Sequence, residues 1–334
     1  MDKIVIEGGI KLSGEVQVSG AKNSALPIMT SSILASGENH ISNIPDLKDI
    51  KTMGRLLSNL GADFHFEDNK VIIQTGSINS IEAPYDLVRT MRGSVLVLGP
   101  LLARMGKAKV SLPGGCVIGE RPINLHLMGL EKMGAEISLK EGYINARVKR
   151  LKGASIYFDM PTVTGTENLM MAACLAEGTT IIENAACEPE VVDLANALIS
   201  MGAHIEGAGT KTLRIKGVEI LKPLNHKIIP DRIETGTFLT AVGITGGNIK
   251  VSGSNTEHID SIVIKLKEVG LDIKYDKDGI KAKGPDRPKS VDIKTMPYPG
   301  FPTDMQAQFV ALMSIADGTS LITENIFENR FMHV

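Results

Sequence analysis

The chain has 334 residues, and its 36 lysines and arginines nearly balance its 38 aspartates and glutamates, which gives a formal net charge of -2 at pH 7. A chain of this length can bury a large core and predicts two or three domains. The near-neutral balance, without a basic cluster, argues against nucleic acid as a partner and favours small-molecule ligands. The longest apolar run, residues 95–103, is broken by Gly99 and Pro100 and is too short to cross a membrane.

The N-terminus and the cysteines narrow the class of protein further. Met1 leads straight into the strand-like sequence KIVIEG, without the charged and apolar regions of a secretory signal, which predicts a cytoplasmic protein. Cys116, Cys174 and Cys187 lack the number and spacing of a disulfide framework or a zinc site. The seven histidines form no HExxH motif. We therefore expect neither a metal nor a cofactor.

The first predicted helix lies in the sequence SGAKNSALPIM, residues 19–29. Pro27 fits only the first turn of a helix or a kink, so the helix is expected to begin near Asn23. Lys22 then lies at the positive end of the helix dipole, where a lysine is unfavourable unless an anion is bound nearby. Lys22 is therefore a candidate anion ligand.

Two sequence patterns recur along the chain with a period of about 70 residues. One ends a helix and precedes a strand, and the other combines a helix end, a glycine stop and a short strand. The copies of the first are LGAD, MGAE, MGAH and VGLD, and those of the second are ILASGENHISN, LLARMGKAKVSL, CLAEGTTIIEN, GITGGNIKVSG and SIADGTSLITEN. Each unit is therefore predicted to contain a helix, a strand, a second helix and a strand pair.

The fifth copy is incomplete, because its LGAD-type pattern would fall about 70 residues after Gly270, just beyond Val334. We expect a truncated version of a longer protein; the alternative is a natural protein with a degenerate last unit. The best domain boundary is the proline-bearing segment KPLNHKIIPD, residues 222–231, between the third and fourth copies.

The loop SLPGGCVIGERP, residues 111–122, places Cys116 between glycines, which predicts an exposed and mobile segment. A structural cysteine is normally buried, as Cys174 is expected to be in the apolar sequence LMMAACLA. Cys187 is also interpreted as structural. A chemical role is therefore assigned to Cys116.

Arg121 precedes a predicted helix that begins with Pro122. Arg121 would then lie beside free backbone N–H groups at the positive helix end, which suits an anion. His126 lies one turn into this helix, off its apolar face, and a solvated histidine without a role is an equally good interpretation. The apolar face is formed by Ile123, Leu127, Leu130 and Met133.

Two later segments place carboxylates before helices. In FPTDMQAQFVALM, Thr303 and Gln306 have the spacing of a capping box. Asp304 either stabilises the first helical turn or acts as a general base toward a substrate hydroxyl. The segment IIPDRIETGTF likewise places charged residues, Asp231, Arg232 and Glu234, before a predicted helix. Several units thus place cations and carboxylates at helix N-termini, and these termini could converge on one anionic ligand.

Seven segments resemble the enolpyruvyl transferase family with the EPSP synthase-like fold, and within it the members that act on UDP-N-acetylglucosamine. The segments are GAKNSALPI, APYDLVRTMRGS, SLPGGCVIGERP, EGTTIIENAA, IPDRIETGTF, FPTDMQAQF and FENRFMHV. The resemblance runs from Met1 to Val334. It implies an α/β fold, a two-domain inside-out α/β barrel of repeated βα units, with the active site in the cleft between the domains. Residues 22–229 would form the first domain, with three repeats, and residues 1–21 plus 230–334 an incomplete second one.

The resemblance implies transfer of the enolpyruvyl group of phosphoenolpyruvate to the 3'-hydroxyl of UDP-N-acetylglucosamine with release of phosphate, the first committed step of peptidoglycan synthesis. Cys116 matches the acid that protonates the methylene carbon, and Asp304 the carboxylate that faces the attacking hydroxyl. Lys22, a third catalytic candidate, matches a cation near phosphoenolpyruvate. The implied substrate-binding residues are Lys22, Asn23, Arg92, Arg121, Pro122, Ile123, Asn124, Leu125, His126, Thr162, Val163, Asp304 and Ile326.

The chain departs from the family pattern in three places. Asn124 stands where the family usually has aspartate, and Thr162, Val163 and Thr164 stand where it usually has serine, valine and glycine. The C-terminal segment that carries further arginines in the family is missing, so we expect weak nucleotide-sugar binding and little turnover.

Three other interpretations remain. A transferase acting on shikimate 3-phosphate shares the fold but would not need the PGGC sequence. A noncatalytic nucleotide-sugar binding module would show the same repeats. A hydrolase using Cys116 and His126 lacks any cue for an orienting third group or an oxyanion site.

Overall fold

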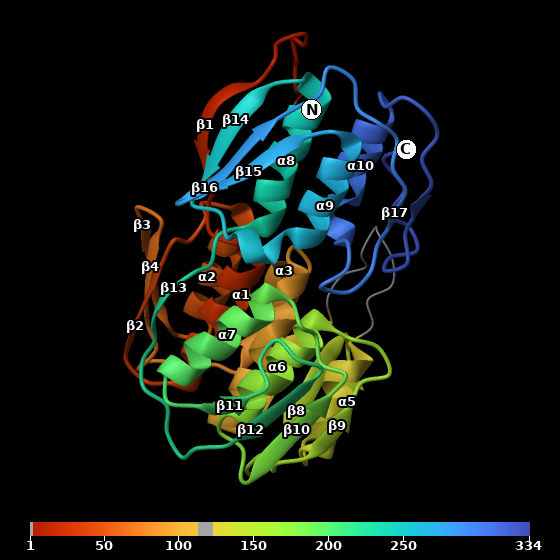
Figure 1. Cartoon of the computed structure of the whole chain (residues 1–334). Coiled ribbons are helices and arrows are strands. Elements are labelled where there is room, and N and C mark those ends of the chain that lie inside the picture. Colours follow the sequence, from red (N-terminus) through yellow and green to blue (C-terminus); the bar gives the residue numbers. More distant parts are fainter. Residues whose placement is uncertain (1–2, 113–122) are drawn as a thin grey trace. The chain divides into compact units, whose positions relative to one another are not determined.

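The computed structural model describes residues 3–112 and 123–334 (Figure 1). The chain folds into two compact units. The larger unit is Gly20–Ile229, and the smaller unit combines Met1–Ser19 with Pro230–Val334. The break between them falls inside the proline-bearing segment 222–231. Within the described ranges, no helix has the length and apolar character needed to cross a membrane.

The repeated unit predicted from the sequence is present in the structure, as a helix, a strand, a second helix and a strand pair. The larger unit holds three such copies. Its α-helices are α1 (Lys22–Ser31), α2 (Lys48–Asn59), α3 (Tyr85–Val88), α4 (Leu98–Met105), α5 (Asn124–Lys132), α6 (Val163–Ala173) and α7 (Pro189–Ser200), and its 3-10 helices are η1 (Ser32–Leu34) and η2 (Arg92–Val97). Its strands are β2 (Glu38–Ser42), β3 (Asp63–Glu67), β4 (Lys70–Gln74), β5 (Glu82–Ala83), β6 (Lys107–Ser111), β7 (Glu136–Lys140), β8 (Tyr143–Arg147), β9 (Ser155–Tyr157), β10 (Thr179–Glu183), β11 (His204–Glu206), β12 (Thr212–Lys216) and β13 (Asn225–Lys227).

The smaller unit holds a fourth copy and part of a fifth. Its helices are α8 (Arg232–Thr245), η3 (Thr256–His258), α9 (Asp260–Val269), η4 (Thr303–Met305) and α10 (Gln306–Met313). Its strands are β1 (Ser13–Gln17), β14 (Asn248–Ser252), β15 (Asp272–Asp276), β16 (Gly279–Lys283), β17 (Ile293–Lys294) and β18 (Ile322–Thr323).

The four-stranded sheets of the described chain share one strand order. They are β13-β2-β4-β3, β5-β6-β8-β7, β9-β10-β12-β11 and β1-β14-β16-β15. In each, the first two strands are parallel, and the others pair antiparallel through a hairpin. The first strand of each sheet comes from a segment outside the hairpin of that sheet. Each sheet therefore connects its own hairpin to another part of the chain. β17 and β18 form a separate parallel pair.

The helices form the core of the larger unit, and the sheets cover them. Helix α1 is buried from Ser24 to Ser31 and helix α6 from Gly165 to Ala173. The outer strands instead alternate between buried and exposed residues, as in β4 and β12. Figure 1 shows the strands at the outside of this unit, around α1 and α6. This is the inside-out arrangement of βα units expected from the sequence.

The glycine stops predicted at the ends of the repeated helices are present, and the structure adds a recurrent asparagine contact after the strands. Gly106 and Gly246 follow α4 and α8 with φ of 68°, a backbone angle that glycine adopts without strain. After the strands, the Nδ2 atoms of Asn43, Asn184 and Asn325 donate to carbonyl oxygens of the neighbouring segment at 2.8, 2.8 and 3.2 Å. The same amide contact therefore closes three copies of the repeat.

Two local predictions were wrong. The sequence KIVIEG forms no strand: residues 3–12 have no regular structure, Ile4 is 89% exposed, and β1 begins only at Ser13. Alternation alone cannot create a strand when no described segment pairs with it. Thr303 and Gln306 form no capping box, because the chain opens with the 3-10 turn η4 and the Thr303 hydroxyl donates to Glu324 Oε2 instead.

Candidate functional site

The residues expected at the site fall into two groups, one in each unit. Lys22, Asn23, Arg92, Ile123, Asn124, Leu125, His126, Thr162 and Val163 belong to the larger unit, and Asp304 and Ile326 to the smaller one. Cys116, Arg121 and Pro122 lie outside the described residues. Among the described residues, no group of three or more histidines, cysteines, aspartates and glutamates could hold a metal ion.

Helix α1 begins at Lys22, within one residue of the predicted start. Its Nζ lies 3.1 Å from Oδ2 of Asp49, an acidic residue in the first turn of α2. Both side chains are partly exposed. Ala21 before the helix provides no side-chain cap, and Asn23 after Lys22 is exposed. The start of α1 thus presents one cation, held by a carboxylate, and one amide to solvent.

His126, on α5, is buried at 3% exposure and is not the solvated histidine that the sequence also allowed. Its Nδ1 lies 3.0 Å from Asn168 Nδ2 of α6, and its Nε2 lies 3.3 Å from Thr164 Oγ1. Burial, followed by the charge of Arg92, lowers the pKa of His126 to about 4. The structure therefore brings Arg92, His126 and the start of α6 together.

The start of α6 is capped by Thr162, whose Oγ1 accepts a hydrogen bond from the Gly165 backbone N–H at 3.2 Å. Val163 is half-buried and Thr164 is exposed, in the first turn of the helix. Helix α6 packs against α5 and η2, and η2 also packs against α1. Thr162, Val163 and Arg92 therefore lie on elements of one packed group, which also includes α1.

In the smaller unit, Asp304 lies in η4 and is partly exposed. Its Oδ1 accepts a charge-assisted hydrogen bond from a guanidinium nitrogen of Arg330 at 2.7 Å. Most of the Arg330 side chain is buried, and its guanidinium lies over the Phe327 ring, 5.5 Å from the ring centroid. Arg330 therefore fixes the direction of the Asp304 carboxylate.

Glu324 is a positioning residue that the sequence analysis missed. Its carboxylate accepts hydrogen bonds from the hydroxyls of Thr295 and Thr303 at 2.8 and 2.9 Å. It also accepts bonds from the backbone N–H groups of Ile326 and Phe327 at 2.8 and 3.1 Å. One carboxylate thus connects the turn that carries Asp304 to the segment that carries Ile326. The glutamate-asparagine pair that ends SLITEN also ends TTIIEN, and this recurrence was the signal available in the sequence.

The charged residues at the start of α8 have structural partners. Asp231 caps the helix, since its Oδ1 accepts from the N–H groups of Ile233 and Glu234 at 2.8 and 3.1 Å. Glu234 accepts a hydrogen bond from the Ser19 backbone N–H at 2.8 Å. The guanidinium of Arg232 lies 5.7 Å from the centroid of the Tyr298 ring. Asp231 and Glu234 therefore have a structural explanation in addition to the proposed ligand role.

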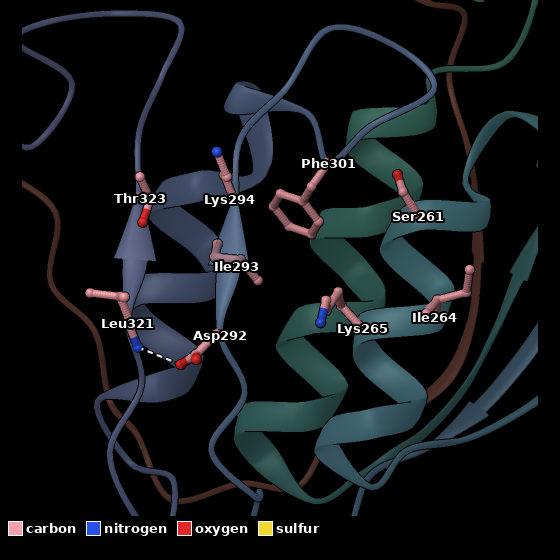
Figure 2. Close-up of a pocket in the computed structure, with 9 residues that line it drawn as sticks. All are labelled: Ser261, Ile264, Lys265, Asp292, Ile293, Lys294, Phe301, Leu321 and Thr323. Atoms are coloured by element: carbon pink, nitrogen blue, oxygen red, sulfur yellow. Dashed lines mark hydrogen bonds between the residues drawn. The ribbon is translucent and has the colours of Figure 1, made fainter.

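A pocket of about 510 Å³ lies in the smaller unit, between α9 and the strands β17 and β18 (Figure 2). Phe301, Ile264 and Leu321 form much of its apolar wall, and the Leu321 backbone N–H donates to Asp292 Oδ1 at 2.7 Å. None of the site residues expected from the sequence lines this pocket. We therefore define the candidate site by the residues expected from the sequence, and this pocket is not part of it.

The surroundings of the two described cysteines raise the pKa values of their thiols. Burial raises the pKa of the Cys174 thiol to about 12, and the thiol donates to the Met170 carbonyl at 3.2 Å. The expectation that Cys174 is a buried structural residue is confirmed. Cys187 is partly exposed, and burial followed by the nearby Glu188 raises its pKa as well. A thiolate nucleophile is disfavoured at both positions.

Glu167, on α6, gives a pH dependence of stability that can be measured. Burial, followed by the nearby Glu190 and Glu188, raises the pKa of Glu167 well above its ordinary value of 4.5. The folded chain therefore binds this proton more tightly than the unfolded chain, so the stabilising contribution is complete below pH 4.5 and is lost as the pH rises through the folded-state pKa. The variant Glu167→Gln cannot ionise, so its stability should fall less between pH 5 and pH 9 than that of the wild type.

Urea unfolding of both proteins across this pH range measures the difference. Glu219→Gln serves as a control, because Glu219 is an exposed carboxylate of the same unit that pairs with Arg150 at 2.8 Å. Parallel pH profiles for the wild type and Glu167→Gln would show that Glu167 ionises in the folded state as it does in the unfolded one.

The chain is similar in sequence to a known protein family and to named relatives. Residues 6–334 match the family model described as EPSP synthase (3-phosphoshikimate 1-carboxyvinyltransferase). Proteins from Thermodesulfovibrio yellowstonii and Geobacter metallireducens, both named UDP-N-acetylglucosamine 1-carboxyvinyltransferase, are 62% and 60% identical to the chain. Each alignment covers 100% of this chain and 80% of the relative.

Solved structures share the fold. The enolpyruvyl transferase NikO from Streptomyces tendae has a TM-score of 0.87 at 24% identity, over 98% of this chain and 78% of the other. An EPSP synthase from Acinetobacter baumannii has a TM-score of 0.72 at 17% identity, over 94% of this chain and 74% of the other. With the family model matched over almost the whole sequence, the chain belongs to the EPSP synthase family of 1-carboxyvinyltransferases.

Proposed function

We propose that the protein transfers the enolpyruvyl group of phosphoenolpyruvate to the 3'-hydroxyl of UDP-N-acetylglucosamine, with release of phosphate. The observation that carries the proposal is the 62% identity, along the entire chain, to a relative named UDP-N-acetylglucosamine 1-carboxyvinyltransferase. Identity to the EPSP synthase of Acinetobacter baumannii is only 17%, which makes shikimate 3-phosphate the less favoured acceptor.

The reaction needs a base for the sugar hydroxyl, an acid for the methylene carbon of phosphoenolpyruvate, and cations for its phosphate and carboxylate. In this proposal Asp304 accepts the hydroxyl proton as the sugar oxygen bonds to the central carbon. Cys116 supplies a proton to the methylene carbon, since an ordinary thiol is mostly protonated at neutral pH. The tetrahedral intermediate then loses a proton and phosphate, which restores the double bond.

The larger unit would provide the binding groups for the anions. Lys22, Arg92 and Arg121 would hold phosphate and carboxylate charges, and the nucleotide sugar would contact Asn23, Thr162, Val163, Ile326 and residues 121–126. The Lys22 ammonium beside Asp49, the Arg92 charge beside His126 and the positive end of the α6 dipole support this assignment. By this activity the protein would act in the cytoplasm, in peptidoglycan synthesis, and so in cell shape and division, without nucleic acid or membrane partners.

Phosphate release from phosphoenolpyruvate tests the proposed reaction. The assay compares UDP-N-acetylglucosamine, shikimate 3-phosphate and no acceptor, with the 334-residue chain and with a chimaera that adds the part of the Thermodesulfovibrio yellowstonii relative that this chain does not cover. Of the three acceptor conditions, we expect release only with UDP-N-acetylglucosamine, and mainly from the chimaera, since the 334-residue chain is expected to turn over little. Release with shikimate 3-phosphate would identify the other transferase, and nucleotide-sugar binding without release from either protein would favour a noncatalytic binding module.

Cys116→Ser should lower the rate of this reaction about 10²-fold while nucleotide-sugar binding stays unchanged, because a serine hydroxyl is a much weaker acid than a thiol. Steady-state kinetics and calorimetric titration measure the two effects. Cys187→Ser is the control, since this partly exposed cysteine should leave both unchanged. A Cys116→Ser variant with the wild-type rate would remove Cys116 from the mechanism.

A further inference from the structure

The pocket shown in Figure 2 lies where the other copies of the repeat have a packing contact. In the larger unit, the second helix of each copy packs against the short parallel strand that follows its hairpin, which is α2 on β5, α5 on β9 and α7 on β13. The corresponding elements of the fourth copy are α9 and β17. The hollow between these two elements has a volume of about 510 Å³. This volume falls in the range of about 300–1,000 Å³ that is typical of small-molecule sites.

Lys265 of α9 occupies a position that belongs to the core in the other copies. It lies four residues before Val269, the first residue of the VGLD pattern. The residues four before LGAD, MGAE and MGAH begin are Leu56, Gly129 and Ala197, and all three are buried. The Lys265 side chain is 30% exposed, and Figure 2 shows it extending from α9 toward β17. A cation therefore lines the hollow at a position where the other copies have a small or apolar core residue.

The pocket also has an apolar wall that is open to solvent on one side. Phe301 is 6% exposed, and its ring packs edge to face against the buried Phe309, with 4.8 Å between the ring centroids. Ile264 and Leu321 also line the pocket and are 56% and 66% exposed. An apolar group bound here would remove this surface from water, which is favourable.

The polar groups that line the pocket have a positive balance. Lys294 and Thr323 lie opposite each other in the parallel pair of β17 and β18, and neither side chain has a hydrogen bond or an ion pair within the described residues. Lys265 pairs with the partly exposed Glu268 at 2.7 Å. The carboxylate in the lining is that of Asp292, and its Oδ1 already accepts a backbone N–H at 2.7 Å. Two ammonium groups and a hydroxyl are thus available to an anionic group.

We propose that the pocket between α9 and β17 binds a small amphipathic anion, an apolar chain or ring that carries one carboxylate. The apolar part lies against Phe301 and Ile264, and the carboxylate binds the ammonium groups of Lys294 and Lys265. An anion is favoured over a cation because the lining holds two lysines and one aspartate. This binding does not depend on enolpyruvyl transfer, since Asp304, the proposed base in the same unit, does not line the pocket.

The matched probes octanoate and octylammonium test the expected chemistry, because they carry similar chains and opposite charges. A titration followed by NMR of isoleucine and leucine methyl groups in the 334-residue chain gives both the affinity and the place of binding. We expect octanoate to shift the methyl signals of Ile264, Ile293 and Leu321 and to bind about tenfold more tightly than octylammonium. Equal affinities for the two probes, or octanoate shifts at other methyl groups and not at these, would overturn the proposal.

Two lysine variants test the two ammonium groups. Lys265→Leu gives α9 the residue that α2 has at this position and should fill the hollow, so octanoate should bind about tenfold more weakly or not at all. Lys294→Gln removes the other charge from an exposed position and should weaken octanoate binding about fivefold. The uncharged probe octan-1-ol should bind Lys294→Gln as well as it binds the wild type.

Lys274→Gln is the matched control for these variants. Lys274 is an exposed lysine of β15 in the same unit, it pairs with Asp272 at 3.2 Å, and it does not line the pocket. Its replacement should leave octanoate binding unchanged, and urea unfolding establishes that each variant is folded. If Lys294→Gln binds octanoate as tightly as Lys274→Gln does, the pocket does not recognise the carboxylate, and the proposal fails whether or not Lys265→Leu folds.

Discussion

Replacing Asp304 with asparagine should lower kcat for enolpyruvyl transfer about 10³-fold, because an amide cannot accept the proton of the sugar hydroxyl. Arg330 holds the Asp304 carboxylate at 2.7 Å in the present structure, and an asparagine oxygen can keep that contact in the variant. The side chain should therefore remain in place while the chemistry is lost. Since the base acts as the hydroxyl attacks, KM for UDP-N-acetylglucosamine should change far less than kcat.

Asp317→Asn is the matched control for this experiment. Asp317 is an exposed aspartate of the same unit, and it also pairs with an arginine, Arg287, at 2.8 Å. Its replacement should leave kcat and KM unchanged, because an exposed ion pair contributes little and no expected site residue depends on it. A kcat for Asp304→Asn within tenfold of the wild type would assign the proton to another group.

The repeated architecture could be predicted from the sequence because its signals are local. Gly106 and Gly246 end their helices through their own backbone angles. The asparagines that follow the strands make the same amide contact in several copies. These residues recur with the repeat period of the sequence, so the sequence alone predicts a unit of helix, strand, helix and strand pair. The start of α1 was also predicted to within one residue, although Pro27 lies inside the helix and not in its first turn.

The arrangement of the site depends on contacts between distant residues, which the pattern of one segment does not contain. His126 and Asn168 are 42 residues apart, and only the packing of α5 against α6 buries the histidine with a polar partner. Thr303 matched a capping box, yet Glu324, 21 residues later, takes its hydroxyl. A carboxylate at such a distance cannot be recognised from spacing along one helix. The chemistry of single residues was therefore easier to predict than their partners.

The start of α1 is anchored by a buried carboxylate that sequence reasoning also missed. Asp193, on α7, is 3% exposed and accepts a hydrogen bond from the Ser24 hydroxyl. The same carboxylate lies 2.8 Å from His226 Nε2 of β13 and accepts from the Ile229 backbone N–H at 3.2 Å. Ser24 follows Lys22 and Asn23 by one turn or less. Asp193 thus joins α1, α7 and the end of the larger unit behind two of the proposed binding residues.

Asp193→Ala should lower the free energy of unfolding by about 3–5 kcal/mol, because it leaves three buried or half-buried polar groups without their acceptor. Asp193→Asn keeps one acceptor oxygen and should cost about half as much. Urea unfolding at pH 7 measures both changes. Asp46→Ala is the control, since Asp46 pairs with Lys51 at 2.6 Å on an exposed surface of the same unit and should cost less than about 1 kcal/mol. If Asp193→Ala unfolds with the same free energy as Asp46→Ala, the buried carboxylate does not hold α1 in place, and Lys22 and Asn23 must be positioned by the packing of the helix alone.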